Sequence, residues 1–366
     1  MITVEAPGRI NLIGEHIDYN GGYVLPGCIN KRIKVSIFKH NKKHCSVHSK
    51  TLNEKFNFHT NEINKSPFHW QNYILGTIDY FKQKGFNISP FHLEISSNLP
   101  IGAGLSSSSA LISAVAKSLI NLFKFKLNKE HIVDCVSYVE KKYMGLNGGL
   151  MDQFTINYGK KNNLIFLNCL DRKHEFIKFD LDEHSLLLIN SNVKHSLLHS
   201  EYNDRVNECN NARLALNNFH KYRKHLAEYT LNDLDKVKGL INQKEFKRAK
   251  FVIEENKRTI NTFNLIKEKK YKIIGNMIYE SHLGLRDLYD VSCNEIDFLV
   301  DQMMKNTNVL GSRMMGGGFG GSVLNLVKGT LNKSILETLN NKYFKSFGKK
   351  ITPIKIKIVD GVKEIK

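Results

Sequence analysis

The chain has 366 residues, of which 41% are hydrophobic and 24% are charged, a composition typical of a globular protein with room for two domains. Its 54 lysines and arginines exceed its 35 acidic residues and give a net charge of +19, but the basic residues lie in short scattered clusters and accompany no nucleic-acid-binding motif, so we expect no nucleic acid partner. No apolar run is long enough for a membrane span and residues 1–11 do not resemble a signal peptide, so we expect no membrane partner and a cytoplasmic protein.

The first element of the chain is residues 8–22, with the sequence GRINLIGEHIDYNGG. Residues 10–13 are apolar enough to form a buried strand, and the Asn-Gly-Gly of residues 20–22 favours a tight turn into a second strand at residues 23–25. Polar side chains near the end of a buried strand are held by a rigid scaffold, which suits a binding site.

Arg9, Glu15, His16 and Asp18 are the candidate functional residues of this stretch. One interpretation is a hairpin whose charges face water. We favour a binding site, because Glu15, His16 and Asp18 form a dense set of hydrogen-bond donors and acceptors for a polyol. Arg9, just before a buried run, also needs an anionic partner.

The next elements lead to a loop rich in glycine and serine. Residues 31–39, 45–51 and 91–96 alternate like strands, and residues 70–81 have the spacing of a helix with one apolar face. Residues 99–109, LPIGAGLSSSS, then precede an apolar helix, and this arrangement gathers unpaired amides that bind phosphate. A flexible linker is the alternative, but a linker would not run directly into an apolar helix. No Gly-Lys-Ser/Thr follows, so the loop is not a Walker A motif.

Two acidic residues follow this loop. A helix is expected at residues 131–143 with Glu140 near its end, and a glycine-rich turn at residues 145–149 places Asp152 just beyond it. Asp152 is flanked by apolar residues, which is consistent with a helix cap and equally with a partly desolvated base of raised basicity. The sequence does not decide between these two roles.

The second half of the chain is expected to be mainly helical over residues 200–300, with a third glycine-rich loop at residues 315–321. Further strands are expected at residues 163–169, 185–189, 322–327 and 351–359. We expect two closely apposed domains, residues 1–184 and residues 185–366, with a cleft between them.

Three sequence motifs, in the order in which they occur along the chain, resemble those of the GHMP small-molecule kinases. Their detailed sequences resemble the galactokinase branch of that family. They are GRINLIGEHIDYNGG, LPIGAGLSSSSA and RMMGGGFGG. Three further stretches, GGLMDQF, SEYNDRVNEC and SHLGLRDLYDVSCNEIDFLV, strengthen the resemblance. It covers nearly the whole chain.

The resemblance implies an α+β fold of two domains, an N-terminal domain like ribosomal protein S5 and a C-terminal ferredoxin-like α/β domain, with the active site between them. It implies an enzyme that uses ATP and Mg²⁺ to phosphorylate galactose at the anomeric hydroxyl, giving galactose 1-phosphate and ADP by direct in-line transfer. We also expect a monomer whose partners are the sugar and the nucleotide.

The resemblance also implies a role for each candidate residue. Asp152 would be the base that accepts the proton of the anomeric hydroxyl, Arg9 would stabilise the transferred phosphoryl group, and Ser108 and Glu140 would hold Mg²⁺. The residues that would bind the sugar are Glu15, His16, Asp18, Gly149 and Tyr202. The residues that would wrap the ATP phosphates are Gly102, Ala103, Gly104, Leu105, Ser106, Ser107 and Ser108.

Several positions depart from the residues common in this family, and they bear on sugar selectivity more than on catalysis. They are Ile17, Asn30, Ser109, Ala110, Gly148 and Met315. Two alternatives stay open: another GHMP sugar kinase, such as one acting on N-acetylgalactosamine, and a non-catalytic sugar sensor of the same family. The presence of both Arg9 and Asp152 favours the enzyme.

Overall fold

A computed structural model of the chain describes residues 1–193 and 198–365. The N-terminal half is built on a six-stranded sheet with the strand order β13-β1-β3-β6-β4-β5. All neighbouring strands in it are antiparallel except β4 and β6, which run parallel. The bounds are β1 Ile2–Asn11, β3 Pro26–Lys39, β4 Cys45–Ser49, β5 Glu54–Phe58, β6 Phe91–Ser97 and β13 Lys363–Ile365.

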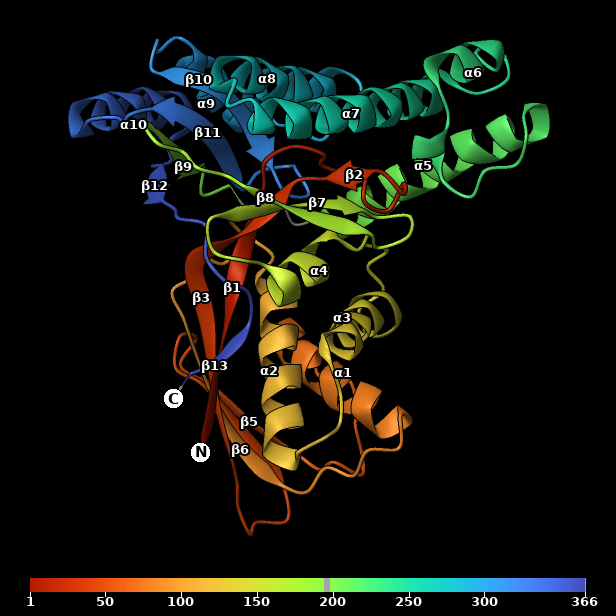
Figure 1. Cartoon of the computed structure of the whole chain (residues 1–366). Coiled ribbons are helices and arrows are strands. Elements are labelled where there is room, and N and C mark those ends of the chain that lie inside the picture. Colours follow the sequence, from red (N-terminus) through yellow and green to blue (C-terminus); the bar gives the residue numbers. More distant parts are fainter. Residues whose placement is uncertain (194–197, 366) are drawn as a thin grey trace.

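Helices cover one face of this sheet, in the lower half of Figure 1. The central helix is α2 (Ser107–Phe123), which packs on β1 and β3, and its apolar stripe of Leu111, Val115 and Leu119 is buried. Helices α1 (His69–Gln83) and α3 (Lys129–Tyr138) pack against α2, and a π-helical turn, Val139–Tyr143, follows α3. The short helix α4 (Met151–Tyr158) lies above them and contacts both α2 and β1.

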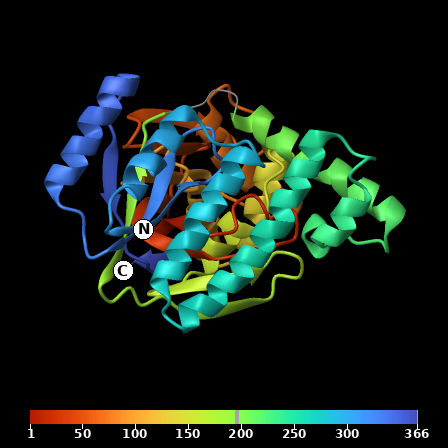
Figure 2. The same ribbon diagram turned by 90° about the horizontal axis from the view of Figure 1, so that it is seen from above.

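A second, four-stranded sheet with the order β10-β11-β9-β12 forms the upper half. Its strands are β9 His184–Asn190, β10 Val309–Met315, β11 Ser322–Lys328 and β12 Thr352–Lys355. Helices α7 and α8 lie side by side across the top of the molecule (Figure 2), and α8 packs on β10. The helices of this half are α5 Leu198–Phe219, α6 Leu231–Lys236, α7 Gln243–Lys267, α8 Tyr271–Asp287, α9 Asn294–Met304 and α10 Lys333–Phe347, with a 3₁₀ turn at Leu226–Glu228.

A small third sheet, β2-β7-β8, lies between the two halves, and the pairing of β2 in this sheet differs from the hairpin that the sequence predicted. Its strands are β2 Tyr23–Val24, β7 Asn163–Asn168 and β8 His174–Lys178. The turn at residues 20–22 forms as predicted, with the amide of Gly22 donating to the carbonyl of Ile17 at 2.8 Å. The strand that follows it pairs with β7, whereas β1 pairs with β3 from Asn11↔Pro26 onward. Residues 12–25, which include the short strand β2, are therefore an excursion between the two paired strands β1 and β3.

Two strand boundaries also differ from expectation. Strand β1 does not start at residue 10 but at Ile2, and it includes Pro7. Its pairing with β3 has a register irregularity between Pro7 and Arg9. A proline is tolerated in a strand at such an irregularity. The strand expected at residues 351–359 ends at Lys355, and the chain then continues to β13, which pairs with β1. The mixed α/β fold expected from the sequence is confirmed, and in the described residues no helix has the length and apolar composition to cross a membrane.

Candidate active site

The centre of the site is an ion pair between Arg9 of β1 and Asp152, the second residue of α4. Arg9 Nε donates to Asp152 Oδ1 at 2.7 Å and Nη2 donates to Oδ2 at 3.2 Å. Arg9 is buried, while 29% of the Asp152 side chain is exposed, so the carboxylate is reachable from solvent. Burial lowers the pKa of Arg9, but Asp152 and the other carboxylates of the site outweigh burial and raise it above its ordinary value. Arg9 therefore has the anionic partner that its buried position requires.

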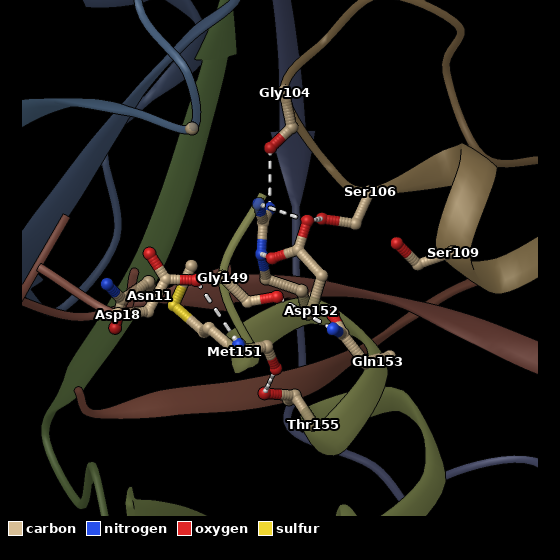
Figure 3. Close-up of polar contacts among 12 residues, drawn as sticks. Asn11, Asp18, Gly104, Ser106, Ser109, Gly149, Met151, Asp152, Gln153 and Thr155 are labelled. Atoms are coloured by element: carbon tan, nitrogen blue, oxygen red, sulfur yellow. Dashed lines mark hydrogen bonds and ion pairs between the residues drawn. The ribbon is translucent and has the colours of Figure 1, made fainter. Parts of the chain in front are cut away.

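The glycine- and serine-rich loop contacts the same ion pair, and Figure 3 shows Gly104 and Ser106 of this loop above Asp152. The carbonyl of Gly104 accepts a hydrogen bond from Arg9 Nη1 at 2.6 Å, and the hydroxyl of Ser106 donates to Asp152 Oδ2. Ser106 adopts a left-handed backbone conformation with φ of 58° immediately before α2 begins at Ser107. The free amides at the start of α2 therefore lie next to Asp152, where an anionic group would be stabilised.

The third glycine-rich loop, residues 315–321, packs against the glycine- and serine-rich loop. A Cβ built on Gly104 would lie 2.8 Å from the carbonyl oxygen of Met315, and Gly104 has φ of +71°, so only glycine fits there. The hydroxyl of Ser322 donates to the carbonyl of Ala103 at 2.8 Å. The two loops, far apart in sequence, are packed backbone against backbone.

Glu15 is almost fully buried and holds two segments together. Its Oε1 accepts the amide of Gly316 at 2.7 Å, and its Oε2 accepts the side-chain amide of Asn11 at 3.1 Å. The fully buried Arg313 approaches Oε1 at 3.4 Å and also donates to the carbonyl of Leu12 at 3.0 Å. Glu15 thus lines the cavity while it ties the first motif to the third.

Asp18 faces the cavity from the same loop and is in close contact with α4. Its Oδ2 accepts the amide of Met151 at 3.3 Å. A Cβ built on Gly149 would lie only 2.1 Å from that same oxygen, so a larger residue at this position would displace the carboxylate. Burial, followed by the charge of Asp152, raises the pKa of Asp18 to about 6.

His16 and Tyr202 form the aromatic wall of the cavity, with ring centroids 5.4 Å apart. His16 has a left-handed backbone with φ of 62°, and its Nδ1 is 2.9 Å from the hydroxyl of Tyr19. Its other nitrogen, Nε2, is inaccessible to solvent and has no hydrogen bond of good geometry among the described residues, although the backbone of Gly317 lies close to the ring. Burial, reinforced by the nearby Arg205, lowers the pKa of His16 to about 3, so the ring is neutral.

Glu140 lies in the π-helical turn after α3, and it is buried. Its Oε1 accepts the hydroxyl of Ser109 at 2.6 Å, and burial is the main reason that its pKa rises to about 7. Ser108 lines the cavity beside it. Among the described residues no group of three or more His, Cys, Asp or Glu could hold a metal ion, so a metal here would depend on these few oxygens and on its own waters.

All these groups surround one cavity of about 190 Å³. The predicted residues that line it are Arg9, Glu15, His16, Asp18, Gly104, Ser106, Ser108, Glu140, Gly149, Asp152 and Tyr202. Four predicted phosphate-loop residues do not line it, namely Gly102, Ala103, Leu105 and Ser107. Six lining residues were not assigned a role from the sequence: Leu146, Gly148, Met151, Gln153, Gly316 and Gly317. The last two lie within the third glycine motif, whereas nothing in the chemistry of Leu146 or Met151 would have singled them out.

Family models match three parts of the chain. The galactokinase galactose-binding signature matches residues 2–38, the GHMP kinases N terminal domain matches residues 72–160, and the GHMP kinases C terminal model matches residues 263–345. The first and second of these contain Arg9 and Asp152 respectively.

Full-length relatives agree with these matches. The chain is 40% identical over 365 residues to a galactokinase of Thermotoga petrophila, with all of both chains covered, and 34% identical to one of Clostridium beijerinckii over 98% of this chain and 94% of the relative. It superposes on the crystal structure of Lactococcus lactis galactokinase complexed with galactose with a TM-score of 0.94 and 30% identity, over 100% of this chain and 95% of the other. A mevalonate kinase structure at 20% identity and a TM-score of 0.68 shares the fold. The chain therefore belongs to the galactokinase family within the GHMP kinases.

Proposed function

We propose that this enzyme transfers the γ-phosphoryl group of ATP to the anomeric hydroxyl of galactose and so produces galactose 1-phosphate and ADP. The observation that carries the proposal is the Arg9–Asp152 pair, which lies where the polyol-binding residues and the glycine-serine loop meet. Phosphoryl transfer requires a positioned nucleophile, a base and charge neutralisation, and this pair supplies the last two.

In the proposed reaction, Asp152 accepts the proton of the anomeric hydroxyl as its oxygen attacks phosphorus in line with the departing ADP. The partly exposed carboxylate lies on the cavity wall, where a bound sugar can reach it. Arg9 holds Asp152 at two points and presents a fixed positive charge that stabilises the transferred group. No covalent enzyme intermediate is needed.

Glu15, His16, Asp18, Gly149 and Tyr202 are proposed to bind the sugar. The carboxylates accept hydrogen bonds from sugar hydroxyls, including the axial hydroxyl at C4 of galactose. An epimer that lacks this hydroxyl in the right place would leave a buried acceptor unpaired, at a cost of about 1–3 kcal/mol. Gly149 contributes by leaving room for the Asp18 carboxylate.

Residues 102–108 and the start of α2 are proposed to bind the ATP phosphates, with Ser108 and Glu140 holding Mg²⁺. The hydroxyl and the buried carboxylate both line the cavity and are hard oxygen donors, which fit this ion. Bound there, Mg²⁺ would neutralise charge on the phosphate oxygens. Glu140, whose pKa of about 7 reflects its burial, would become fully ionised beside a cation.

The test is release of ADP from ATP and Mg²⁺ with a panel of galactose, N-acetylgalactosamine and glucose. We expect galactose to be the best substrate and glucose to be poor. Equal turnover of galactose and glucose would contradict the selectivity argument. Preference for N-acetylgalactosamine would assign the chain to another sugar kinase, and sugar binding without ADP release would indicate a sensor.

A further inference from the structure

Ser106 is the residue immediately before α2, and its side chain does not cap this helix. A serine at this position normally accepts a hydrogen bond from an amide of the first turn. Asn128, Asn242 and Asn332 do this for α3, α7 and α10, where each side chain accepts the amide three residues further on. The Ser106 side chain makes no such bond, so its hydroxyl is free to contact another group.

The backbone of Ser106 also has a conformation that suits glycine better than serine. Its φ of 58° and ψ of 46° lie in the left-handed region, which residues with a Cβ adopt at a cost. Two earlier positions of the same loop, Gly102 and Gly104, have positive φ and are glycines. A side chain present in this conformation, without a capping role, points to a function of its hydroxyl.

The Ser106 hydroxyl contacts the carboxylate of Asp152, to which it donates at Oδ2 (Figure 3). Arg9 binds the two oxygens of this carboxylate unequally, because Nε lies 2.7 Å from Oδ1 whereas Nη2 lies 3.2 Å from Oδ2. Charge-assisted hydrogen bonds from nitrogen are usually about 2.7–2.9 Å long. Arg9 therefore holds Oδ1 firmly and Oδ2 loosely, and Ser106 is the second anchor of the carboxylate.

The direction of the bond between Ser106 and Asp152 follows from chemistry, since an ionised carboxylate can only accept hydrogen bonds. Arg9 and Ser106 together donate three hydrogen bonds to a group with roughly four acceptor positions. One position is left for a substrate hydroxyl, and both Ser106 and Asp152 line the cavity. The carboxylate is thus held against rotation and can still accept a proton.

We propose that Ser106 is a positioning residue that fixes, together with Arg9, the orientation of the Asp152 carboxylate toward the anomeric hydroxyl. The inference rests on the proposed function, in which Asp152 is the base. The uncapped amides at the start of α2 remain open to a phosphate, while the Ser106 hydroxyl serves the base. Without this hydroxyl the carboxylate can rotate, so fewer bound sugars meet it in a reactive orientation.

The first test removes the hydroxyl in two ways that differ in backbone strain, Ser106→Ala and Ser106→Gly. In both variants kcat should fall about 10–100-fold, the loss expected for one hydrogen bond to a charged group, while the KM values for galactose and ATP stay within about threefold. Ser106→Gly should melt at a higher temperature than Ser106→Ala, because glycine adopts this φ freely. Recovery of kcat in the glycine variant would show that the backbone matters and the hydroxyl does not, which would overturn the inference. A tenfold rise in the KM for ATP would assign the hydroxyl to phosphate binding and would overturn it as well.

Lys124→Gly and Lys124→Ala are the matched control variants for the effect of backbone strain. Lys124 follows the last residue of the same helix α2, has a left-handed backbone with φ of 56°, is exposed and does not line the cavity. The glycine variant should again melt at the higher temperature, and both variants should keep the kcat of wild type. A loss of kcat in Lys124→Gly as large as that in Ser106→Gly would contradict a specific role of the Ser106 hydroxyl.

The decisive experiment combines Ser106→Ala with Asp152→Asn. If Ser106 acts through Asp152, the serine substitution should change kcat less than about twofold once the carboxylate is gone. A further loss of tenfold or more in the Asp152→Asn background would mean that Ser106 acts independently, and would overturn the inference.

The same four proteins also give a measurement that needs no substrate. The two substitutions should shift the melting temperature non-additively, because the two side chains bind each other. Additive shifts would overturn the inference even if galactose is phosphorylated. By contrast, a kcat of Asp152→Asn alone within a few-fold of wild type would overturn the proposed base, and with it the positioning role of Ser106, whatever the melting temperatures show.

Discussion

The two loops that form the site differ in how much of each is open to solvent. In the sugar loop, residues 12–22, Leu12, Ile13 and Ile17 are fully buried and Glu15 and His16 are nearly so. In the phosphate loop, residues 99–109, the tip is open, with Ile101 56% exposed and Gly102 also exposed, while Ala103 and Leu105 beside it are buried. A loop that must distinguish one hydroxyl configuration gains from being fixed before the ligand arrives, whereas a loop that covers phosphates with backbone amides needs only an open approach.

Two consecutive residues of α7 fix the sugar loop at both ends. Glu255 Oε1 accepts the amide of Gly14 at 2.9 Å, and Asn256 Oδ1 accepts the amide of Tyr23 at 2.8 Å. Glu255 is itself fully buried and accepts the hydroxyl of Ser281 at 2.6 Å. The phosphate loop, by comparison, is held by Arg9, which donates to the carbonyls of Gly104 and Leu105, and by contacts with the third glycine-rich loop.

The largest effect is expected where the two loops meet, at Asp152. Asp152→Asn removes the proposed base and should reduce kcat by about 10²–10⁴-fold, while galactose and ATP still bind because both loops remain intact. Steady-state kinetics and equilibrium binding of galactose measure the two quantities separately. A kcat within a few-fold of wild type would show that Asp152 is not the base, and a simultaneous loss of galactose binding would make it a sugar-positioning residue.

The next effect tests how rigid the sugar loop is. Gly149→Ala places a methyl group on the Asp18 carboxylate and should raise the galactose KM by roughly 10–100-fold, equivalent to about 1–3 kcal/mol of strain, with little change in the KM for ATP. Gly239→Ala is the control, since a Cβ at Gly239 meets no atom within 4 Å. An unchanged galactose KM in Gly149→Ala would show that the sugar loop yields as readily as an open loop.

A smaller change is expected from loosening one end of the sugar loop. Asn256→Ala leaves the Tyr23 amide without its acceptor and should raise the galactose KM a few-fold, in line with the loss of one hydrogen bond. The control is Asn332→Ala, which removes the N-cap of α10. We expect it to lose a similar amount of stability, but the residue lies away from the site. If both variants shift the galactose KM equally, the clamp by α7 has no specific role in sugar binding.

The smallest effect concerns stability, because the ionised carboxylate of Asp18 in the sugar loop destabilises the folded protein. Because the pKa of Asp18 is raised from 3.8 to about 6, its contribution to stability falls as pH rises through that window and remains unfavourable above it. Asp18→Asn should therefore melt higher than wild type at pH 8, by about 1–2 °C per kcal/mol recovered, and this difference should vanish near pH 4. Thermal melts at the two pH values measure it, and a lower melting temperature of the variant at pH 8 would contradict the argument.

Local patterns in the sequence predicted the elements that carry chemistry. The apolar stripe of α2, the helix at residues 70–81 and the strand before the phosphate loop are all confirmed, because each depends on the periodicity of a single segment. The motifs also placed Arg9 and Asp152 in one site, although residue roles and the division at residue 184 remain predictions.

What the sequence could not provide was the identity of long-range partners. Glu255 and Asn256 lie on helix α7, whose sequence contains no recognisable motif, and only the tertiary fold brings them to the sugar loop. The pairing of β2 with β7, in place of a hairpin, likewise depends on strands about 140 residues apart. Such contacts are set by tertiary packing, which local periodicity does not encode.

The position of β13 has a consequence for how the protein is made. This strand pairs with β1 at Thr3↔Ile365, so the outer edge of β1 has no partner until the ribosome has released residue 365. At about 5–20 residues per second, the strand that carries Arg9 waits roughly 20–70 s with an open edge. Open strand edges are templates for unwanted pairing, so the nascent chain is most exposed to aggregation through β1 during this interval, and a terminal extension that hinders β13 would prolong it.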